Sequence, residues 1–171
     1  MSEEKEKTLD EVMKLLELQE EILQFTHFTN ADAWELGNLI VTEAKKRELN
    51  IAVSIRLNNG LIPFQYIFDG KTLINQKWLE RKFNTVKETE SSSLYLYTKL
   101  EKTDRTMNDI FMDEMKYANA GGGFPIRLEE VGVIGAVIVS GLNHVADHDL
   151  IIKCLSKYLH IDEVPRIRDA Y

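Results

Sequence analysis

Two histidines spaced four residues apart are the first feature of the sequence that could serve chemistry. His144 and His148 lie near the start of an expected helix, where residues four apart share one face. Imidazoles in this arrangement can share a metal ion, with the carboxylate of Asp147 or Asp149 as an oxygen ligand. No glutamate lies between the histidines, so the zinc-protease pattern is absent. The sequence therefore leaves two interpretations of His144, Asp147 and His148: a metal site, or polar residues that favour a helix N-terminus.

A run of three glycines is the second candidate. Gly121, Gly122 and Gly123 precede Phe124 and Pro125. Ordering three consecutive glycines costs conformational entropy, so a compensating role is expected. A ligand lying against the bare amides is one such role, and close packing of the loop beneath a helix is the other. The spacing fits neither a P-loop nor a dinucleotide-binding fingerprint.

These two segments are expected to meet at one edge of a sheet. Residues 124–128 form an expected strand that hairpins into residues 131–140, and the second strand ends where the last helix begins. In an antiparallel pair the start of one strand lies beside the end of the next. Backbone amides from the glycines and from the helix N-terminus suit an anion. The predicted ligand site consists of Gly121, Gly122, Gly123, Phe124, Pro125, Ser140, Gly141 and His148.

A β-hairpin is the best-specified local structure in the chain. Apolar residues alternate with small or polar ones over residues 51–57, which is typical of a strand with one buried face. Asn59-Gly60 then suits a tight turn that needs positive φ values, and residues 61–68 form the return strand. Pro63 cannot donate a hydrogen bond to a neighbouring strand, so it is expected at an edge or a bulge. We expect this hairpin to pair with residues 131–140 in one sheet.

Helices are expected around these strands. Thr8 and Glu11 form a capping-box pattern, and Asn30 is a plausible cap for the second helix. Over residues 91–102, Ser92 could cap a short helix, although residues 94–97 also alternate like a strand; we favour the helix. Residues 108–118 are expected to be a short helix or irregular. The expected helices are residues 8–25, 29–49, 75–89, 91–102 and 145–159. The order of elements predicts one domain over residues 1–171, an α/β (α+β) sandwich with an antiparallel sheet flanked by helices.

The composition narrows the class of protein. A formal net charge of −7, with no basic stripe beyond Lys45-Lys46-Arg47, argues against a nucleic-acid partner. The single cysteine, Cys154, excludes an internal disulfide. Residues 1–7 lack the apolar stretch of a signal peptide, and the longest apolar run, residues 133–139, is too short for a membrane span. We therefore expect a cytoplasmic protein with no membrane insertion. The sequence contains no Gly-x-Ser-x-Gly motif, which would have indicated a nucleophilic serine. The sequence does not decide whether the protein is an enzyme.

The second half of the sequence resembles the GlcG–HbpS–PduO C-terminal family. The likeness rests on Tyr117-Ala118, on residues 121–127, on residues 132–141 and on Asp147-His148. It is strongest to a branch that includes a yeast protein linked to the targeting of tail-anchored membrane proteins. The resemblance implies a profilin-like sandwich, and it implies function related to haem binding, haem degradation or cobalamin. It also implies dimers that build larger assemblies.

Departures from the family pattern leave two hypotheses for function. Relatives often carry histidine where this chain has Ala120, and proline where it has Asn143, so one metal or haem ligand is missing here. The first hypothesis is a small-ligand protein, for which haem or a related tetrapyrrole is the candidate cofactor. The second is a non-catalytic oligomeric interaction module. Trp34 and Trp78 lie on helices whose inward faces other residues fill, so we predict a homo-oligomer, at least a dimer.

Overall fold

Four antiparallel strands form one sheet at the centre of the protein. The structure is a computed structural model, which describes residues 7–167. The strands are β1 (Ala52–Leu57), β2 (Phe64–Ile67), β3 (Gly123–Leu128) and β4 (Gly132–Ser140), in the spatial order β2-β1-β4-β3. This arrangement confirms the predicted fold class and the pairing of the hairpin with residues 131–140.

The β1–β2 hairpin forms as its turn residues predict. Ala52 pairs with Ile67 and Ile55 with Phe64, and Gly60 has a φ of 99°. Pro63 immediately precedes β2, which is an edge strand of the sheet. At this edge the missing N–H of Pro63 removes no hydrogen bond from a neighbouring strand.

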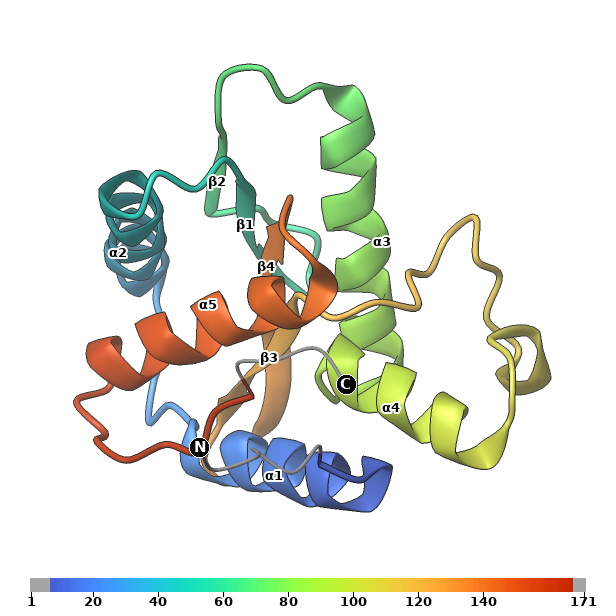
Figure 1. Ribbon diagram of the computed structural model, residues 1–171. Coiled ribbons are helices and arrows are strands. Elements are labelled where there is room, and N and C mark those ends of the chain that lie inside the picture. The colour runs from blue at the N-terminus through green and yellow to red at the C-terminus, as the bar shows by residue number, and fades with distance from the viewer. Residues whose placement is uncertain (1–6, 168–171) are drawn as a thin grey trace, which may run out of the picture.

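Helices cover both faces of the sheet (Figure 1). Strand residues such as Val53 and Val137 pack into one core with α2 and α5, whereas Ala52 and Ile138 pack into a second core with α3. The central strands are therefore buried on both faces, as the nearly continuous apolar sequence of β4 predicts. The helices are α1 (Leu9–Ile22), α2 (Asn30–Lys46), α3 (Leu73–Thr89), α4 (Ser93–Thr103) and α5 (His144–Tyr158), with a short 3₁₀ helix, η1 (Asn108–Ile110).

Capping side chains decide where the helices begin. Thr8 forms the predicted capping box with Glu11. The prediction of Asn30 as a cap is wrong, because Thr29 caps α2 through a reciprocal pair of hydrogen bonds with Asp32. Thr72 caps α3, which therefore starts two residues earlier than expected. The segment around residues 91–102 is helical rather than extended: α4 runs from Ser93 to Thr103, with Ser92 as its N-cap.

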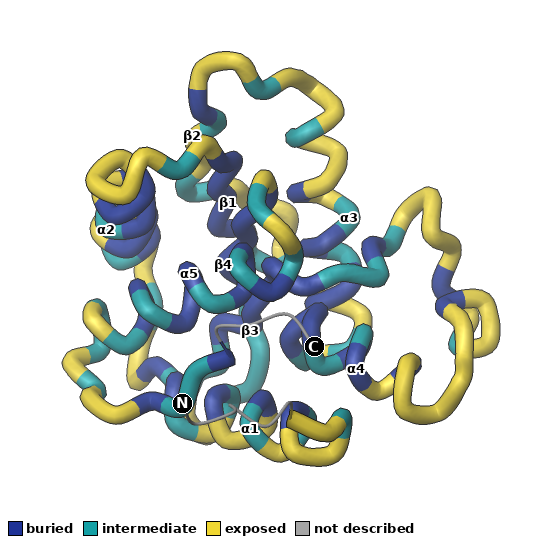
Figure 2. The backbone as a smooth tube through the Cα atoms, in the orientation of Figure 1, coloured by how far each residue is buried: buried dark blue, intermediate teal, exposed yellow. Residues whose placement is uncertain are grey.

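Several large apolar residues are exposed. Figure 2 shows exposed segments, in yellow, on the outer parts of the helices and on the connecting loops. Trp34 is 63% exposed and Trp78 is 38% exposed, so Trp34 is not a core residue. Cys154 is buried, and burial raises the pKa of its thiol to about 12. Within residues 7–167, no helix combines the length and the apolar character that crossing a membrane requires.

The contact between α1 and α4 encloses an acidic side chain. Val12 and Leu16 of α1 pack with Leu94 of α4, and the carboxylate of Glu20 accepts a hydrogen bond from the backbone N–H of Ser92 at 3.2 Å. Burial raises the pKa of Glu20 to about 7, because desolvation outweighs this hydrogen bond. The folded protein therefore holds a proton on Glu20 at a pH where the unfolded chain has lost it.

We predict that Glu20 makes stability fall as pH rises from about 4.5 to about 7. In this window the folded state binds more protons than the unfolded state, so each rise in pH favours unfolding. The total contribution is at most about 3 kcal/mol. Urea unfolding at several pH values should show a flatter dependence for Glu20→Gln, which keeps the acceptor oxygen. The exposed Glu21→Gln is the matched control and should follow the wild type; a Glu20→Gln curve parallel to wild type contradicts the prediction.

Candidate functional site

The glycine run and the start of α5 meet, as the strand topology predicts. The backbone N–H of Gly121 donates to Nδ1 of His144 at 3.0 Å. The carbonyl oxygen of Gly122 accepts from the N–H of Val139 at 2.8 Å, and the N–H of Gly123 donates to Oγ of Ser93 at 2.9 Å. Protein groups therefore hold polar backbone atoms of all three glycines.

Close packing explains why these positions are glycine. A Cβ on Gly121 would lie 2.5 Å from the carbonyl oxygen of His144, and a Cβ on Gly123 would lie 2.7 Å from a methyl group of Val86. Gly122 has a φ of 114°, and a Cβ there would lie 2.4 Å from the carbonyl oxygen of Val139. Side chains would collide at all three positions, so the packing interpretation accounts for the run without a ligand.

A buried ion pair lies directly beneath the glycines. Nζ of Lys82 lies 3.0 Å from Oδ2 of Asp147, and both side chains are 2% exposed. The same ammonium donates to the carbonyl oxygen of Val139 at 3.0 Å, and Oδ1 of Asp147 accepts from the N–H of Leu142 at 2.9 Å. This contact joins α3, the end of β4 and the start of α5.

Burial acts against the charges of both partners. Desolvation lowers the pKa of Lys82, although Asp147 counteracts the shift. Desolvation raises the pKa of Asp147, although Lys82 and the backbone amides counteract it. Each charge therefore depends on the other, and the loss of one leaves its partner desolvated and unpaired. Sequence reasoning did not predict the ion pair of Lys82. The one available signal was the position of this lysine between Leu79 and Phe83 on an apolar helix face.

His148 is completely buried and is held by α1. Its Nε2 lies 2.8 Å from Oε1 of Gln19, whose amide nitrogen donates to the carbonyl oxygen of Pro165 at 2.7 Å. The amide orientation makes Oε1 the acceptor, so Nε2 carries the proton and donates. Burial lowers the pKa of His148 to about 4, which keeps the ring neutral. Its Nδ1 has no hydrogen-bond partner among residues 7–167.

The residues predicted as metal ligands are held by separate protein partners. Nδ1 of His144 accepts from Gly121, Asp147 pairs with Lys82, and the alternative ligand Asp149 pairs with Arg166 at 2.6 Å. In the part of the chain that the structure describes, no three histidine, cysteine or acidic side chains are arranged to hold a metal ion. The predicted ligands thus contribute to packing around α5.

An open cleft lies elsewhere, between the α1–α2 connection, the start of α2 and the end of α5. It has a volume of about 510 Å³, and we call it the His27 cleft. Two imidazoles line it, those of His27 and His160, together with the ammonium of Lys157. The remaining lining is largely apolar or acidic and comprises Phe25, Thr26, Asp32, Glu35, Leu39, Tyr158 and Leu159.

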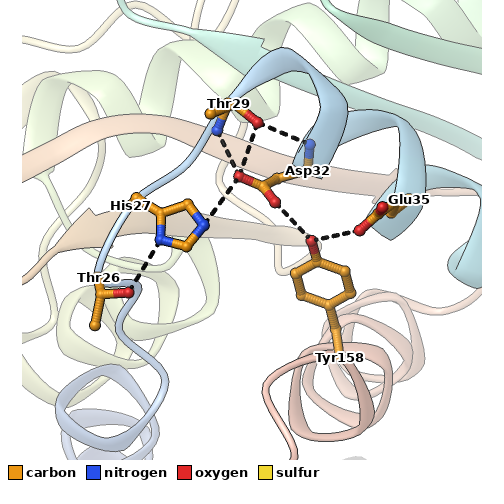
Figure 3. Close-up of polar contacts among 6 residues, drawn as sticks. All are labelled: Thr26, His27, Thr29, Asp32, Glu35 and Tyr158. Atoms are coloured by element: carbon orange, nitrogen blue, oxygen red, sulfur yellow. Dashed lines mark hydrogen bonds and ion pairs between the residues drawn. The ribbon is translucent and has the colours of Figure 1, made fainter.

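A chain of polar contacts runs along one wall of the His27 cleft (Figure 3). The Tyr158 hydroxyl lies 3.0 Å from Oδ1 of Asp32 and 3.2 Å from Oε2 of Glu35. Nε2 of His27 lies 3.8 Å from Oδ2 of Asp32, and its Nδ1 lies 3.2 Å from Oγ1 of Thr26. Sequence reasoning missed this cluster, since Tyr158 and Asp32 are 126 residues apart.

The protonation of this wall follows from its contacts. Burial alone would raise the pKa of the Asp32 carboxyl, but hydrogen bonds from Thr29 and Tyr158 hold it below its usual range. Burial and the two neighbouring carboxylates raise the pKa of Tyr158. The wall therefore presents a neutral phenol and an ionised Asp32 at neutral pH. The imidazoles of the two histidines supply the cleft's candidate metal-binding nitrogens.

Comparison with known proteins agrees with this architecture. Residues 28–156 match the family described as haem degrading protein HbpS-like, and the chain belongs to that family. A UPF0303 protein of Streptomyces avermitilis is 39% identical over 145 residues, covering 84% of this chain and 88% of the relative.

Solved structures share the fold. The crystal structure of Ybr137w has a TM-score of 0.80 and 29% identity, covering 86% of this chain and 87% of that chain. The crystal structure of a PduOC–haem complex has a TM-score of 0.63 and 16% identity, covering 75% of this chain and 93% of that chain, and this likeness shows the fold alone. A link with the targeting of tail-anchored proteins stays a prediction.

We predict that Lys82→Met destabilises the protein by about 3–5 kcal/mol, because it leaves Asp147 buried without its cation. Adding Asp147→Asn removes that charge and keeps the acceptor for the Leu142 N–H, so the double variant should be more stable than Lys82→Met alone. Urea unfolding measures both differences. The exposed pair of Lys102 and Asp10 supplies the matched control, and Lys102→Met should cost less than about 1 kcal/mol. Equal losses of unfolding free energy for Lys82→Met and Lys102→Met would contradict the prediction, because they would show that burial does not make the Lys82–Asp147 pair more sensitive than an exposed pair.

Proposed function

We propose that this protein binds haem or a related tetrapyrrole in the His27 cleft. The observation that carries the proposal is that two imidazoles, from His27 and His160, line one open cleft with an apolar lining of Phe25 and Leu39. Imidazole is a common axial ligand of haem iron, and an apolar wall suits the face of the macrocycle. Membership of the HbpS-like family supports this choice of ligand.

The side chains of the cleft fit such a ligand. The imidazole of His160 makes no hydrogen bond or ion pair with any of residues 7–167, so the ring is available. Nδ1 of His27 can donate to Oγ1 of Thr26, which makes Nε2 the nitrogen for a metal; the exposed ring would then turn Nε2 away from Oδ2 of Asp32, which lies 3.8 Å from it. Lys157 can pair with a propionate, while Asp32 and Glu35 would repel one. Bound haem would supply redox-active iron; the chain's own residues would bind and orient it.

The glycine run is a less suitable place for the ligand. The amides of Gly121 and Gly123 already donate to His144 and Ser93, and the adjacent His148 is fully buried. Binding there would require α5 to separate from the loop, whereas the His27 cleft is open. The ligand role of the glycine run, Ser140, Gly141 and His148 stays a prediction, and the next experiment distinguishes the two locations.

Haemin titration followed by its visible spectrum tests the proposal. The wild type should give a saturable Soret band, and His27→Ala combined with His160→Ala should weaken binding at least about tenfold, because both candidate iron ligands are lost. His144→Gln, beside the glycine run, is the matched control and should bind as the wild type does. Weakening by His144→Gln with no effect of the cleft variant would assign the ligand to the glycine run instead.

A second candidate function is self-association, favoured by exposed apolar side chains beside the edge strand. We define the β2 surface as Trp34, Leu61, Ile62, Tyr66, Ile74 and Trp78, each 38–67% exposed. Trp34 packs on Phe64 of β2, and Gln65 of β2 bonds to Gln76 of α3, so both helices flank the strand. Exposed aromatic groups and free strand edges are typical of interfaces. We infer that this surface forms the contact in a homo-oligomer.

Light scattering at micromolar concentration tests the inference. The wild type should have a mass at least twice the 19.7 kDa of one chain. Trp34→Arg combined with Ile62→Arg should shift the mass to near 19.7 kDa, because two charges would enter the apolar contact. Leu18→Arg, at an exposed position on α1, should leave the mass unchanged. A monomeric wild type would refute self-association.

A further inference from the structure

A second pocket lies between the end of α3, helix α4 and residues 105–112. It has a volume of about 440 Å³, and we call it the α4 groove. None of its lining residues belongs to the His27 cleft, and Figure 1 shows α4 on the opposite side of the molecule from the end of α5. Its size falls within the range of pockets that bind small organic molecules.

The floor of the α4 groove is apolar. Leu96 and Leu100 lie four residues apart on one face of α4, and both are more than nine-tenths buried. Ile110 and Met112 form the facing wall. Since these four side chains already line a common cluster, the groove offers a continuous apolar surface of aliphatic and thioether groups.

The facing wall is held in place by backbone hydrogen bonds. The N–H of Met112 donates to the carbonyl oxygen of Met107, and the N–H of Arg105 donates to that of Leu100, each at 3.0 Å. Phe111 has a φ of 65°, which is unfavourable for a residue with a bulky side chain, and it is 97% exposed. This conformation turns Ile110 and Met112 toward the pocket while Phe111 faces solvent, so the wall is formed before any ligand arrives.

Two cations, Lys99 and Arg105, line the same groove, and neither forms an ion pair with a carboxylate of residues 7–167. The ammonium of Lys99 makes no hydrogen bond or ion pair with another described residue. The guanidinium of Arg105 donates to the carbonyl oxygen of Asp109 at 3.2 Å, and its charge helps to lower the pKa of the Asp109 carboxyl without forming an ion pair with it. Glu88 also lines the groove, but its Oε2 faces the Tyr117 hydroxyl at 3.5 Å. A positive end beside an apolar floor is the complement of an amphipathic anion.

We propose that the α4 groove binds an amphipathic carboxylate, a molecule with one carboxylate head and an unbranched alkyl body. The carboxylate pairs with Lys99 and Arg105, and the alkyl chain lies on Leu96, Leu100, Ile110 and Met112. A sugar phosphate or nucleotide would meet too few polar partners on this floor, and a neutral alkane would leave both cations unused. The proposal does not depend on haem binding, because the two pockets share no residue.

Isothermal titration of the wild-type protein with a series of carboxylates tests the apolar part. Acetate, hexanoate, octanoate and decanoate are each added below the concentration at which they aggregate. Affinity should increase about fourfold for each methylene buried, until the groove is filled. The absence of saturable binding for every chain length, or an affinity that does not change with chain length, would overturn the proposal. This measurement needs no variant and therefore no assumption about folding.

Charge variants test the head-group contact. Lys99→Gln combined with Arg105→Gln should weaken decanoate binding by about tenfold or more, since both charge-assisted hydrogen bonds are lost. Lys77→Gln, at an exposed position on α3, is the matched control for a lost positive charge and should bind decanoate as the wild type does. The His27→Ala and His160→Ala variant should also retain decanoate binding. Decanoate affinity that is unchanged by the Lys99 and Arg105 substitutions, or reduced by those at His27 and His160, would contradict the assignment.

Discussion

The ion pair of Lys82 and Asp147 constrains the arrangement of every element around it. Its two charges have almost no access to water, so they are satisfied by each other and by backbone groups of β4 and the β4–α5 loop. An alternative position of α3 or α5 would separate the charges inside a low-dielectric interior, which is costly. The pair therefore selects one packing of the two helices on opposite faces of the sheet. Hydrophobic contacts stabilise that packing, but they are less sensitive to register than a buried charge pair.

The glycine run is the backbone counterpart of this constraint. The loop can pass over Lys82 and Asp147 only where no Cβ is present, and a Cβ on Gly122 would lie 2.7 Å from Nζ of Lys82. A segment that resembles a ligand-binding loop in the sequence thus seals a buried polar cluster. Two pockets formed by residues 7–167, the His27 cleft and the α4 groove, lie instead at the periphery. Membership of the HbpS-like family is compatible with either location, because family and fold do not specify a site.

Local sequence determined much of the fold. The alternation of β1, the Asn-Gly turn and the continuous apolar run of β4 specify the hairpin and a central strand, since each depends on neighbours within a few residues. The meeting of the glycine run with α5 also followed from antiparallel topology. The start of α2 was placed wrongly by one residue because Thr29 and Asn30 are both acceptable caps, and the reciprocal bond from Asp32 decides between them.

Only the tertiary structure decided the polar contacts between residues that are distant in the chain. Lys82 and Asp147 are 65 residues apart, Tyr158 and Asp32 are 126 apart, and His148 and Gln19 are 129 apart. The partner of a lysine or a histidine on an apolar helix face cannot be predicted from the local sequence, because it depends on how the helices dock on the sheet. The same applies to the His27 cleft, whose walls come from the two ends of the chain. The sequence alone determined the elements and their order; helix docking decided which side chains are buried as pairs and which remain open to a ligand.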